Sequence, residues 1–524
     1  GDATCFRVGP ARFISLADPE LAQHVLVRNH RNYVKSRNYE GLRLVLGNGL
    51  VTSEGEHWRR QRKLAQPAFH RQRLAALAEV MATCVEERLQ AWDERTLRGP
   101  ATVDVHQEMM QLTLRIVGRT LFGTDLGTDL GELGPAITTA LHKANDFAES
   151  LLRLPLWLPT PSNLRFGRAK RVLDGIVHHI IEERRRSAQA GEAQRDDVLG
   201  MLMSATDDSG TERMSDEDLR DEVMTLFLAG HETIATAMSW TWMLLHQHPH
   251  VAARVRDEAA TVLGGRAPGL HDLPRLTYTS QVLDEAMRLY PPAWIMERAA
   301  LEEDRLGPWR VPPRAIVAVS PWVLHRHPAL WPEPSRFDPD RFAPERAEGR
   351  HKHAYLPFGA GPRICIGNAF ALMEAKIILA TMIQRYAVEV TRPDRVVPDP
   401  KRTLREGAVL AWGKRGSVAL ALEVDAAVKA LGVPPDTAWS DLAEEQRHAI
   451  LFGVADATDT KGKARRRRGE YAGIVPRLEA IIESGEAIAQ RDEDDEPEDG
   501  EPDDVGRFVV TRICDACGGK RLRP

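Results

Sequence analysis

The pattern of apolar and polar positions predicts a mainly helical protein with a few short strands. Residues 4–16 alternate between apolar and polar side chains and break at Gly9-Pro10, which predicts two short strands. A helix is expected after Asp18-Pro19, because proline suits the first turn of a helix. Between residues 73 and 205 most segments have the spacing of amphipathic helices separated by proline-rich turns.

The longest expected helix runs from Ser215 to His248. Ser215 and Asp218 have the spacing of a capping box, acidic residues cluster in the first turn, and Pro249 ends the run. Three β segments are expected after it, namely a hairpin at residues 307–319 and strands at residues 388–391 and 416–424.

Composition narrows the class of protein. The chain has 524 residues, 43% of them hydrophobic and 28% charged, which is ordinary for a globular protein. Its formal charge of −5 argues against nucleic acid as a partner of the whole chain. No apolar run is long enough to span a membrane and no signal peptide is visible, so we expect no membrane partner.

The five scattered cysteines argue against a disulfide framework and favour a reducing, cytoplasmic location. The first residue is not Met and lies within a strand-like run, so we expect that an N-terminal segment is missing.

A cysteine in a loop rich in glycine and proline is the strongest candidate for chemistry. This cysteine loop, Leu356-Pro-Phe-Gly-Ala-Gly-Pro-Arg-Ile-Cys-Ile-Gly-Asn-Ala-Phe370, leads into an apolar run with helical spacing. Cys365 therefore lies at or just before a helix N-terminus. Because backbone N–H groups stabilise an anion there, we expect this thiol to ionise more readily than a free one. A buried structural cysteine beside a turn is the alternative.

A second candidate site lies near the start of the chain. Trp58 and Arg62 are four residues apart, so they share a helix face and can bind one anion through an indole N–H and a guanidinium. A solvated basic helix face is the alternative for this pair.

The middle of the long helix carries Ala229-Gly-His-Glu-Thr233. Glycine, glutamate and threonine are poor choices for a buried helix centre unless chemistry requires them. Thr233 can donate a hydrogen bond to a ligand and Glu232 can relay protons from solvent. A threonine that bonds the carbonyl one turn back is the structural alternative. We interpret His231 as structural.

A third motif is Asp284-Glu-Ala-Met-Arg-Leu-Tyr-Pro-Pro292. It places Glu285 and Arg288 on one helix face before a proline stop, although a single Glu-x-x-Arg carries little information. The later segment Phe337-Asp-Pro-Asp-Arg-Phe342 supplies Arg341 as a third partner. A buried network of this type is structural rather than catalytic.

Phe358, Gly361, Arg363, Cys365 and Gly367 spell Phe-x-x-Gly-x-Arg-x-Cys-x-Gly, which closely resembles the haem-binding loop of the cytochrome P-450 monooxygenases. The other three motifs resemble motifs of the same family. The resemblance covers residues 3–424. It implies a haem domain at residues 1–424 with a mainly α fold, a helical triangular prism with a small β region.

The resemblance also implies roles for these residues. The cofactor would be haem b, with the Cys365 thiolate as the axial ligand of its iron, glycines that let the thiolate approach the macrocycle, and Phe358 covering the sulfur. The implied partners of the haem propionates are Trp58, Arg62, Arg298 and Arg363. The implied oxygen-activation motif comprises Ala229, Gly230, Glu232 and Thr233, and the implied structural network near the haem comprises Glu285, Arg288 and Arg341.

The implied reaction is insertion of one oxygen atom from O2 into an apolar small molecule. No nicotinamide or flavin fingerprint follows residue 424, so electrons are expected from a ferredoxin or flavodoxin with its reductase. A peroxygenase or isomerase on the same fold is an alternative. Glu232 and Thr233 count against it, because those chemistries need no relay of protons to dioxygen.

Residues 425–524 are a different kind of sequence, with a basic run at 461–468 and an acidic run at 492–504. They resemble an internal fragment of UvrA, the damage-sensing ATPase of bacterial excision repair, but contain no phosphate-binding Gly-x-x-x-x-Gly-Lys motif. Cys514 and Cys517 are half of a four-ligand zinc site, and zinc is not expected there. We interpret this region as a partly disordered appendage. A DNA-repair or interaction protein acting through this tail is the alternative function.

Overall fold

The computed structural model describes residues 2–8, 11–97, 101–125, 130–150, 155–191, 197–206, 214–390, 402–406, 418–443, 446–447, 449–450 and 509–513. The chain forms two compact units. The first comprises Gly1–Glu389 and Thr511–Pro524, and the second comprises Val390–Val510.

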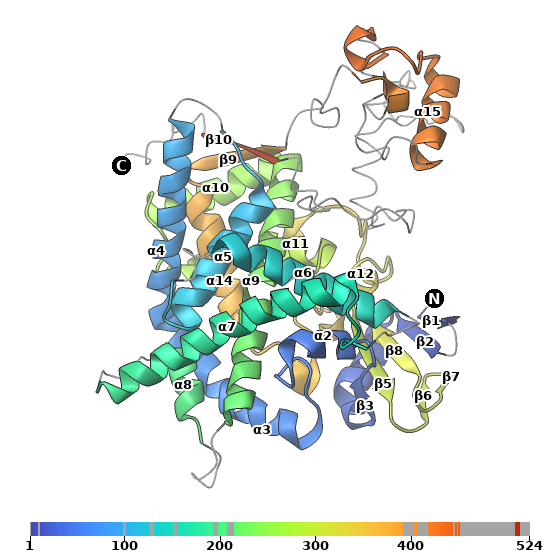
Figure 1. Ribbon diagram of the computed structural model, residues 1–524. Helices are drawn as coiled ribbons and strands as arrows, with labels where there is room; N and C mark the ends of the chain where they lie inside the picture. Colours follow the sequence, from blue (N-terminus) through green and yellow to red (C-terminus); the bar gives the residue numbers. More distant parts are fainter. Residues whose placement is uncertain are drawn as a thin grey trace. The chain divides into compact units, whose positions relative to one another are not determined.

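The first unit is mainly helical with a small sheet, which confirms the predicted fold class (Figure 1). Its α-helices are α1 (Pro19–Gln23), α2 (Tyr39–Leu46), α3 (Gly55–Ala65), α4 (Arg71–Thr96), α5 (Val105–Leu121), α6 (Leu130–Glu149), α7 (Pro161–Gln189), α8 (Val198–Ser204), α9 (Asp216–Gln247), α10 (Pro249–Leu263), α11 (Thr277–Leu289), α12 (Pro321–Leu324), α13 (Pro344–Ala347) and α14 (Asn368–Met382). Shorter helical turns are η1 (His24–Arg28), η2 (His30–Asn32), η3 (Gln66–Phe69), η4 (Leu273–Arg275), η5 (Pro339–Phe342), η6 (Lys352–Ala354) and η7 (Gly361–Arg363).

The main sheet has five strands in the order β1-β2-β8-β5-β3. The predicted first two strands, β1 (Ala3–Val8) and β2 (Ala11–Leu16), are antiparallel. β2 pairs in parallel with β8 (Ile316–Val319), which pairs antiparallel with β5 (Met296–Ala300). β5 in turn pairs antiparallel with β3 (Tyr33–Lys35). The sheet thus joins the start of the chain to segments about 300 residues later, and it buries an apolar core.

The hairpin expected at residues 307–319 is only partly correct. The hairpin pairs β6 (Asp304–Leu306) with β7 (Trp309–Val311) around Gly307, which has a φ of 59°. Ile316–Val319 instead enters the main sheet as β8. All four β8 residues are buried, so packing in the main sheet decided their partner, which the alternation alone does not encode.

The longest helix that the structure describes, α9, confirms the helix expected between Ser215 and His248. The Ser215 side chain accepts the N–H of Asp218 at 3.0 Å, and the Asp218 carboxylate accepts the N–H of Ser215 at 3.4 Å, as in a capping box. α5, α7, α11 and α14 all contact α9, which explains why most of this helix is buried. The expected strand near residue 388 is β9 (Tyr386–Val390).

The second unit contains η9 (Leu404–Glu406), α15 (Val418–Leu431) and η11 (Trp439–Asp441), and β10 (Val509–Ile513) spans the boundary between the units. The strand expected at residues 416–424 is wrong, because the chain is helical from Val418. Apolar and polar residues alternate only at the start of this segment. A run rich in alanine and leucine, which favour helices, then continues to Gly432, whose φ of 63° suits a helix end. Within the described residues, no helix combines the length and apolar character needed to cross a membrane.

Candidate functional site

The cysteine loop joins η6 to α14 and is closed by hydrogen bonds within itself. The N–H of Cys365 donates to the carbonyl oxygen of Phe358 at 2.9 Å, and the N–H of Ile364 donates to that of Gly361 at 3.1 Å. Gly361 has a φ of 69°, and a Cβ there would lie 2.0 Å from the carbonyl oxygen of Leu26. Only glycine therefore allows the loop to lie against η1.

Cys365 lies just before α14, as expected, and its side chain is exposed. The surrounding protein nevertheless restricts hydration of the sulfur and raises the pKa of the thiol, while the N–H of Gly367 and the charge of Arg62 act in the opposite direction. The prediction of a readily ionised thiol is therefore wrong for the protein alone. A metal cation on the sulfur would reverse the balance, because a coordinated thiol is deprotonated.

α3 places Trp58 and Arg62 beside the cysteine loop. Arg62 Nη1 donates to the carbonyl oxygen of Ile364 at 2.9 Å, immediately before Cys365. The guanidinium carbon of Arg363 lies 4.3 Å from the centroid of the Trp58 ring. The structure thus brings together two sequence motifs that are about 300 residues apart.

The surroundings of Arg363 include two groups that sequence reasoning missed, Glu54 and Lys35. Arg363 forms an ion pair with Glu54, and its Nη1 donates to the carbonyl oxygen of Ser53 at 3.1 Å. Lys35 lies opposite Arg298 in the β3–β5 pair. Burial, and next the charge of Arg363, lower the pKa of Lys35 to about 6. Because a pKa of about 6 leaves Lys35 largely neutral at pH 7, the positive charges near Glu54 are chiefly those of Arg363 and Arg298, and these favour binding of a further anion.

The middle of α9 is open on one side. Ala229 and Thr233 are exposed, whereas most residues in the flanking turns are buried. Because they are four residues apart, they face the same direction. The Thr233 hydroxyl donates to the carbonyl oxygen of Ala229 at 2.8 Å, which is the structural alternative that the sequence left open. A Cβ on Gly230 would lie 3.0 Å from Cγ2 of Val117, so glycine permits the close approach of α5.

The two residues between Gly230 and Thr233 differ in burial. His231 is fully buried, and its Nδ1 lies 2.8 Å from the carbonyl oxygen of Phe227, in agreement with a structural role. Burial lowers the pKa of His231 to about 4. Glu232 is half-buried, and burial raises the pKa of its carboxyl group against the opposing charges of His106 and His142. Glu232 therefore holds a proton more strongly than an exposed glutamate does.

Comparison with known proteins explains this arrangement. A model of the cytochrome P450 family matches residues 1–412. Cyclooctatin synthase from Streptomyces melanosporofaciens is 41% identical over 408 residues, which cover 78% of this chain and 87% of that protein. The chain belongs to the cytochrome P450 family. A model of the UvrA DNA-binding domain also matches residues 393–494, so both resemblances found in the sequence are confirmed.

Other relatives of this P450 are named as oxygenases. Cyclooctat-9-en-7-ol 5-monooxygenase from Streptomyces melanosporofaciens is 37% identical, with 77% of this chain and 84% of that protein covered. Pentalenene oxygenase from Streptomyces avermitilis is 37% identical, with 75% and 85% covered. The protein is therefore a P450 monooxygenase, an oxidoreductase that uses haem iron, O2 and a redox partner to act on an organic substrate.

The residues around the cysteine loop fit a haem group. Cys365 provides a thiol for the haem iron. The cations of Arg62, Arg298 and Arg363 are available for the two propionate carboxylates of haem. A Cβ on Gly367 would lie 4.0 Å from the sulfur of Cys365. Glycine at this position therefore leaves space beside the thiol. Phe358 belongs to the same loop and is half-buried.

Glu285, Arg288 and Arg341 of the P450 meet in one buried network. Arg288 is bidentate to Glu285, with nitrogen–oxygen distances of 2.6 and 2.8 Å, and both side chains are fully buried. Arg341 Nε lies 3.3 Å from Glu285 Oε1. Arg288 also donates to the carbonyl oxygens of His325 and Pro334, at 2.8 and 2.7 Å. The network ties α11 to the segments that precede the cysteine loop.

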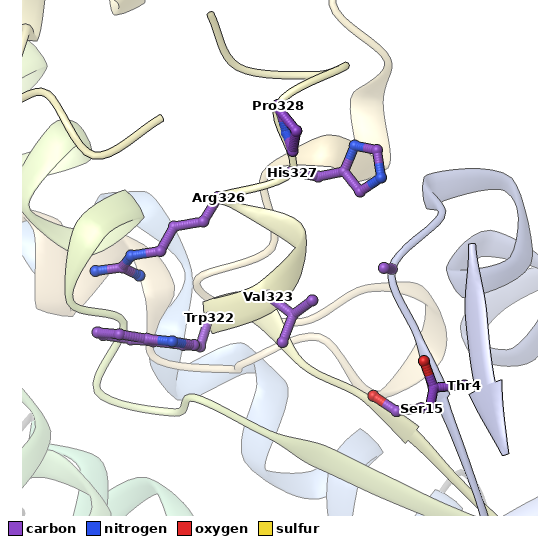
Figure 2. Close-up of a pocket in the computed structure, with 8 residues that line it drawn as sticks. Thr4, Ser15, Trp322, Val323, Arg326, His327 and Pro328 are labelled. Carbon is purple, nitrogen blue, oxygen red and sulfur yellow. The ribbon is translucent and has the colours of Figure 1, made fainter. Parts of the chain in front are cut away.

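A separate surface cavity of about 470 Å³ lies between the first strands and α12 (Figure 2). It contains none of the predicted site residues. Figure 2 shows the Arg326 side chain extended over the Trp322 ring, at 3.3 Å from its centroid. The ring covers one face of the guanidinium, whose buried nitrogens have no hydrogen-bond partner among the described residues. Because the cavity contains none of the predicted site residues, we do not assign it to the reaction.

Cys514 and Cys517 lie outside the described residues. Among the residues that the structure does describe, no group of three or more His, Cys, Asp or Glu side chains could hold a metal ion.

Proposed function

We propose that this P450 inserts one oxygen atom from O2 into a terpenoid hydrocarbon or alcohol, using electrons from a separate ferredoxin or flavodoxin and its reductase. The names of its relatives support this substrate class, since they include a pentalenene oxygenase and a cyclooctat-9-en-7-ol monooxygenase. The observation that carries the proposal is the thiol of Cys365 at the start of α14, with a cluster of cations beside it.

In this proposal the cofactor is haem b, which when bound activates O2 for insertion into a carbon–hydrogen bond. Cys365 would ligate its iron, and Trp58, Arg62, Arg298 and Arg363 would hold its carboxylates. Gly361 and Gly367 would let the loop approach closely, and Phe358 would limit access of water to the sulfur. The Glu285–Arg288–Arg341 network would keep the preceding segments in place.

The open face of α9 would serve as the proton-delivery side. The Thr233 hydroxyl donates to Ala229 in the structure, and rotation about χ1 would turn it from that carbonyl towards the site. Glu232, whose pKa burial raises, would store a proton and pass it towards Thr233. Ala229 is exposed on the same face and leaves room beside Thr233.

The decisive experiment replaces the thiol. We expect Cys365→Ser to lose the thiolate-haem absorption spectrum of the reduced, carbon-monoxide-treated protein, because a hydroxyl is a far poorer iron ligand than a thiolate. Incubation of the unmodified enzyme with terpenoid hydrocarbons, ¹⁸O2 and a ferredoxin system should yield products with one ¹⁸O atom. A Cys365→Ser variant that retains the thiolate spectrum would contradict the assignment.

A second candidate function, DNA binding, is favoured by the match of residues 393–494 to the UvrA DNA-binding domain. The basic run at residues 461–468 is chemically suited to phosphate. We propose a division at residue 424 into a haem domain and an appendage that binds neither DNA nor zinc. Gel-shift titration of the full chain with duplex DNA tests this, and binding that disappears on truncation after Val424 would favour the second candidate.

A further inference from the structure

Asp304, at the start of β6, is the centre of a hydrogen-bonded cluster that includes none of the predicted site residues. Its Oδ2 accepts three side-chain hydrogen bonds, from the Tyr33 hydroxyl at 2.7 Å, from Asn29 Nδ2 at 2.9 Å and from His24 Nε2 at 2.9 Å. All three donors come from the segment that contains η1 and the start of β3, more than 270 positions earlier in the chain. We call these four residues the Asp304 cluster.

Asp304 holds its donors as an ionised carboxylate. Its side chain is only 14% exposed, and Tyr33 is buried. Burial raises the pKa of Asp304, but the hydrogen bonds, led by that of Tyr33, outweigh burial and hold the pKa below its usual value. Because a carboxylate oxygen can only accept hydrogen bonds, His24 must carry its proton on Nε2. Hydrogen bonds to a charged acceptor are stronger than neutral ones, so the carboxylate holds its three donors firmly.

The Asp304 cluster fixes both ends of η1. His24 is the first residue of this turn and Asn29 follows its last residue. The N–H of Asn29 donates to the carbonyl oxygen of His24 at 2.8 Å, so the backbone closes the same turn that the Asp304 carboxylate holds from outside. Tyr33 is the first residue of β3, so the cluster also ties η1 to the main sheet.

The cysteine loop packs against η1. A Cβ on Gly361 would lie 2.0 Å from the carbonyl oxygen of Leu26. Leu26 is buried in the middle of the turn that Asp304 holds at both ends. Gly361 comes four residues before Cys365, and its carbonyl oxygen accepts the N–H of Ile364 at 3.1 Å. Because segments packed this closely move together, a shift of η1 would reach the residue next to the thiol.

We propose that Asp304 is a positioning residue for the haem thiolate and acts through η1 on the cysteine loop. This inference rests on the proposed function, because it takes Cys365 as the ligand of the haem iron. Without the Asp304 charge the two ends of η1 are released, Gly361 follows η1, and the Cys365 sulfur is held less accurately. The competing account is that Asp304 only stabilises the fold, which predicts a less stable protein with an unchanged iron–thiolate bond.

Asp272 provides a matched control. Its side chain is 8% exposed and accepts hydrogen bonds from both terminal nitrogens of Arg266, at 2.6 and 2.7 Å, and from the N–H of Gly269 at 2.9 Å. The bonds from Arg266 lower the pKa of Asp272 to about 2, so it is ionised like Asp304. Its partners lie within six residues of it, in the link between α10 and η4. Asp272→Asn therefore weakens a comparable set of bonds that does not involve η1.

The test uses the full-length, haem-loaded protein without substrate. The absorption band of the reduced, carbon-monoxide-treated protein and the reduction potential of the haem report the iron–thiolate bond, and urea unfolding reports stability. We expect Asp304→Asn to raise the ratio of haem without a thiolate ligand to haem with one by about 10-fold, since a hydrogen bond to a charged group contributes about that factor to an equilibrium constant. The potential should become more positive, because a weaker thiolate bond donates less electron density to iron.

A second variant keeps the test decisive if Asp304→Asn does not fold. Asn29→Ala leaves the carboxylate in place and releases one end of η1, so both haem readouts should change in the same direction but by less. Asp272→Asn should lower the stability towards urea and leave both haem readouts unchanged.

The positioning role is overturned if Asp304→Asn and Asn29→Ala change only the stability, or if Asp272→Asn changes the haem readouts as much as they do. Both readouts are taken without turnover. An enzyme that oxidises no terpenoid but shows the Asp304 effect would therefore refute the proposed substrate class and leave the positioning role standing.

Discussion

The Glu285–Arg288 pair provides a quantitative test of the scaffold. Glu285→Gln removes the negative charge and leaves the guanidinium of Arg288 fully buried, where it now faces only carbonyl oxygens. Breaking a buried ion pair by removing one partner costs about 3–5 kcal/mol, because the remaining charge stays out of water without its counter-ion. Glu285 also accepts the N–H of Asp338 at 2.9 Å, and the neutral amide oxygen of Gln would accept it more weakly.

Arg254 and Asp340 form the matched control. Their nitrogen–oxygen distances are 2.9 and 3.0 Å, so this pair is also bidentate, but the side chains are 51% and 42% exposed. Water replaces a lost partner there, and Asp340→Asn should cost less than about 1 kcal/mol.

The assay is urea unfolding of the haem-loaded enzyme, followed by far-ultraviolet circular dichroism and by haem absorbance. We expect Glu285→Gln to lower the free energy of unfolding several times more than Asp340→Asn does. The double variant Glu285→Gln with Arg288→Met should recover part of the loss, because it removes the buried charge of Arg288 and leaves only that of Arg341. Equal costs for the two single variants would refute the reasoning.

Three further predictions follow from the site and its surroundings. Thr233→Ala should leave haem and substrate binding intact but release more peroxide per electron consumed, and unchanged coupling would mean that another group handles the proton. Burial lowers the pKa of His325 from 6.5 to about 3, so between these pH values the imidazole is neutral in the folded protein and protonated in the unfolded chain. The free energy of unfolding should therefore have its full value above pH 6.5 and decrease as the pH falls towards 3. The decrease should be shallower in His325→Asn. The formal charge of residues 425–524 is −7, so these residues would repel an acidic ferredoxin. Truncation after Val424 should retain haem, and the rate of reduction by the ferredoxin should stay the same or, at low salt, increase. Loss of haem would contradict this prediction.

The features that the sequence predicted well are those encoded within one or two turns of chain. The capping box at Ser215 and Asp218 needs only a three-residue spacing, and Asp18 caps α1 just before the proline that marked it. The cysteine loop is equally local, because its glycines and its thiol lie within ten residues. Local signals of this kind can be recognised in a single sequence without any knowledge of the fold.

Strand pairing was harder to predict because its causes are distant. Alternation between residues 307 and 319 predicted a hairpin, but β8 instead pairs with β2 and β5 in the main sheet, where all four of its residues are buried. The helix at Val418–Leu431 shows the reverse problem, since its first residues alternate like a strand. There the helix propensity of the longer run outweighed the short pattern.

The charges around Arg363 show why a motif does not determine the chemistry of a site. The motif suggested that this arginine is free for a haem carboxylate, but it is already paired with Glu54, a residue more than 300 positions earlier. A carboxylate bound beside the cysteine loop would therefore share Arg363 with Glu54, and would also rely on Arg62 and Arg298. Its charge would also act on Lys35, whose pKa of about 6 leaves it largely neutral at pH 7. An anion nearby raises that pKa, so we expect binding of the carboxylate to draw a proton onto Lys35.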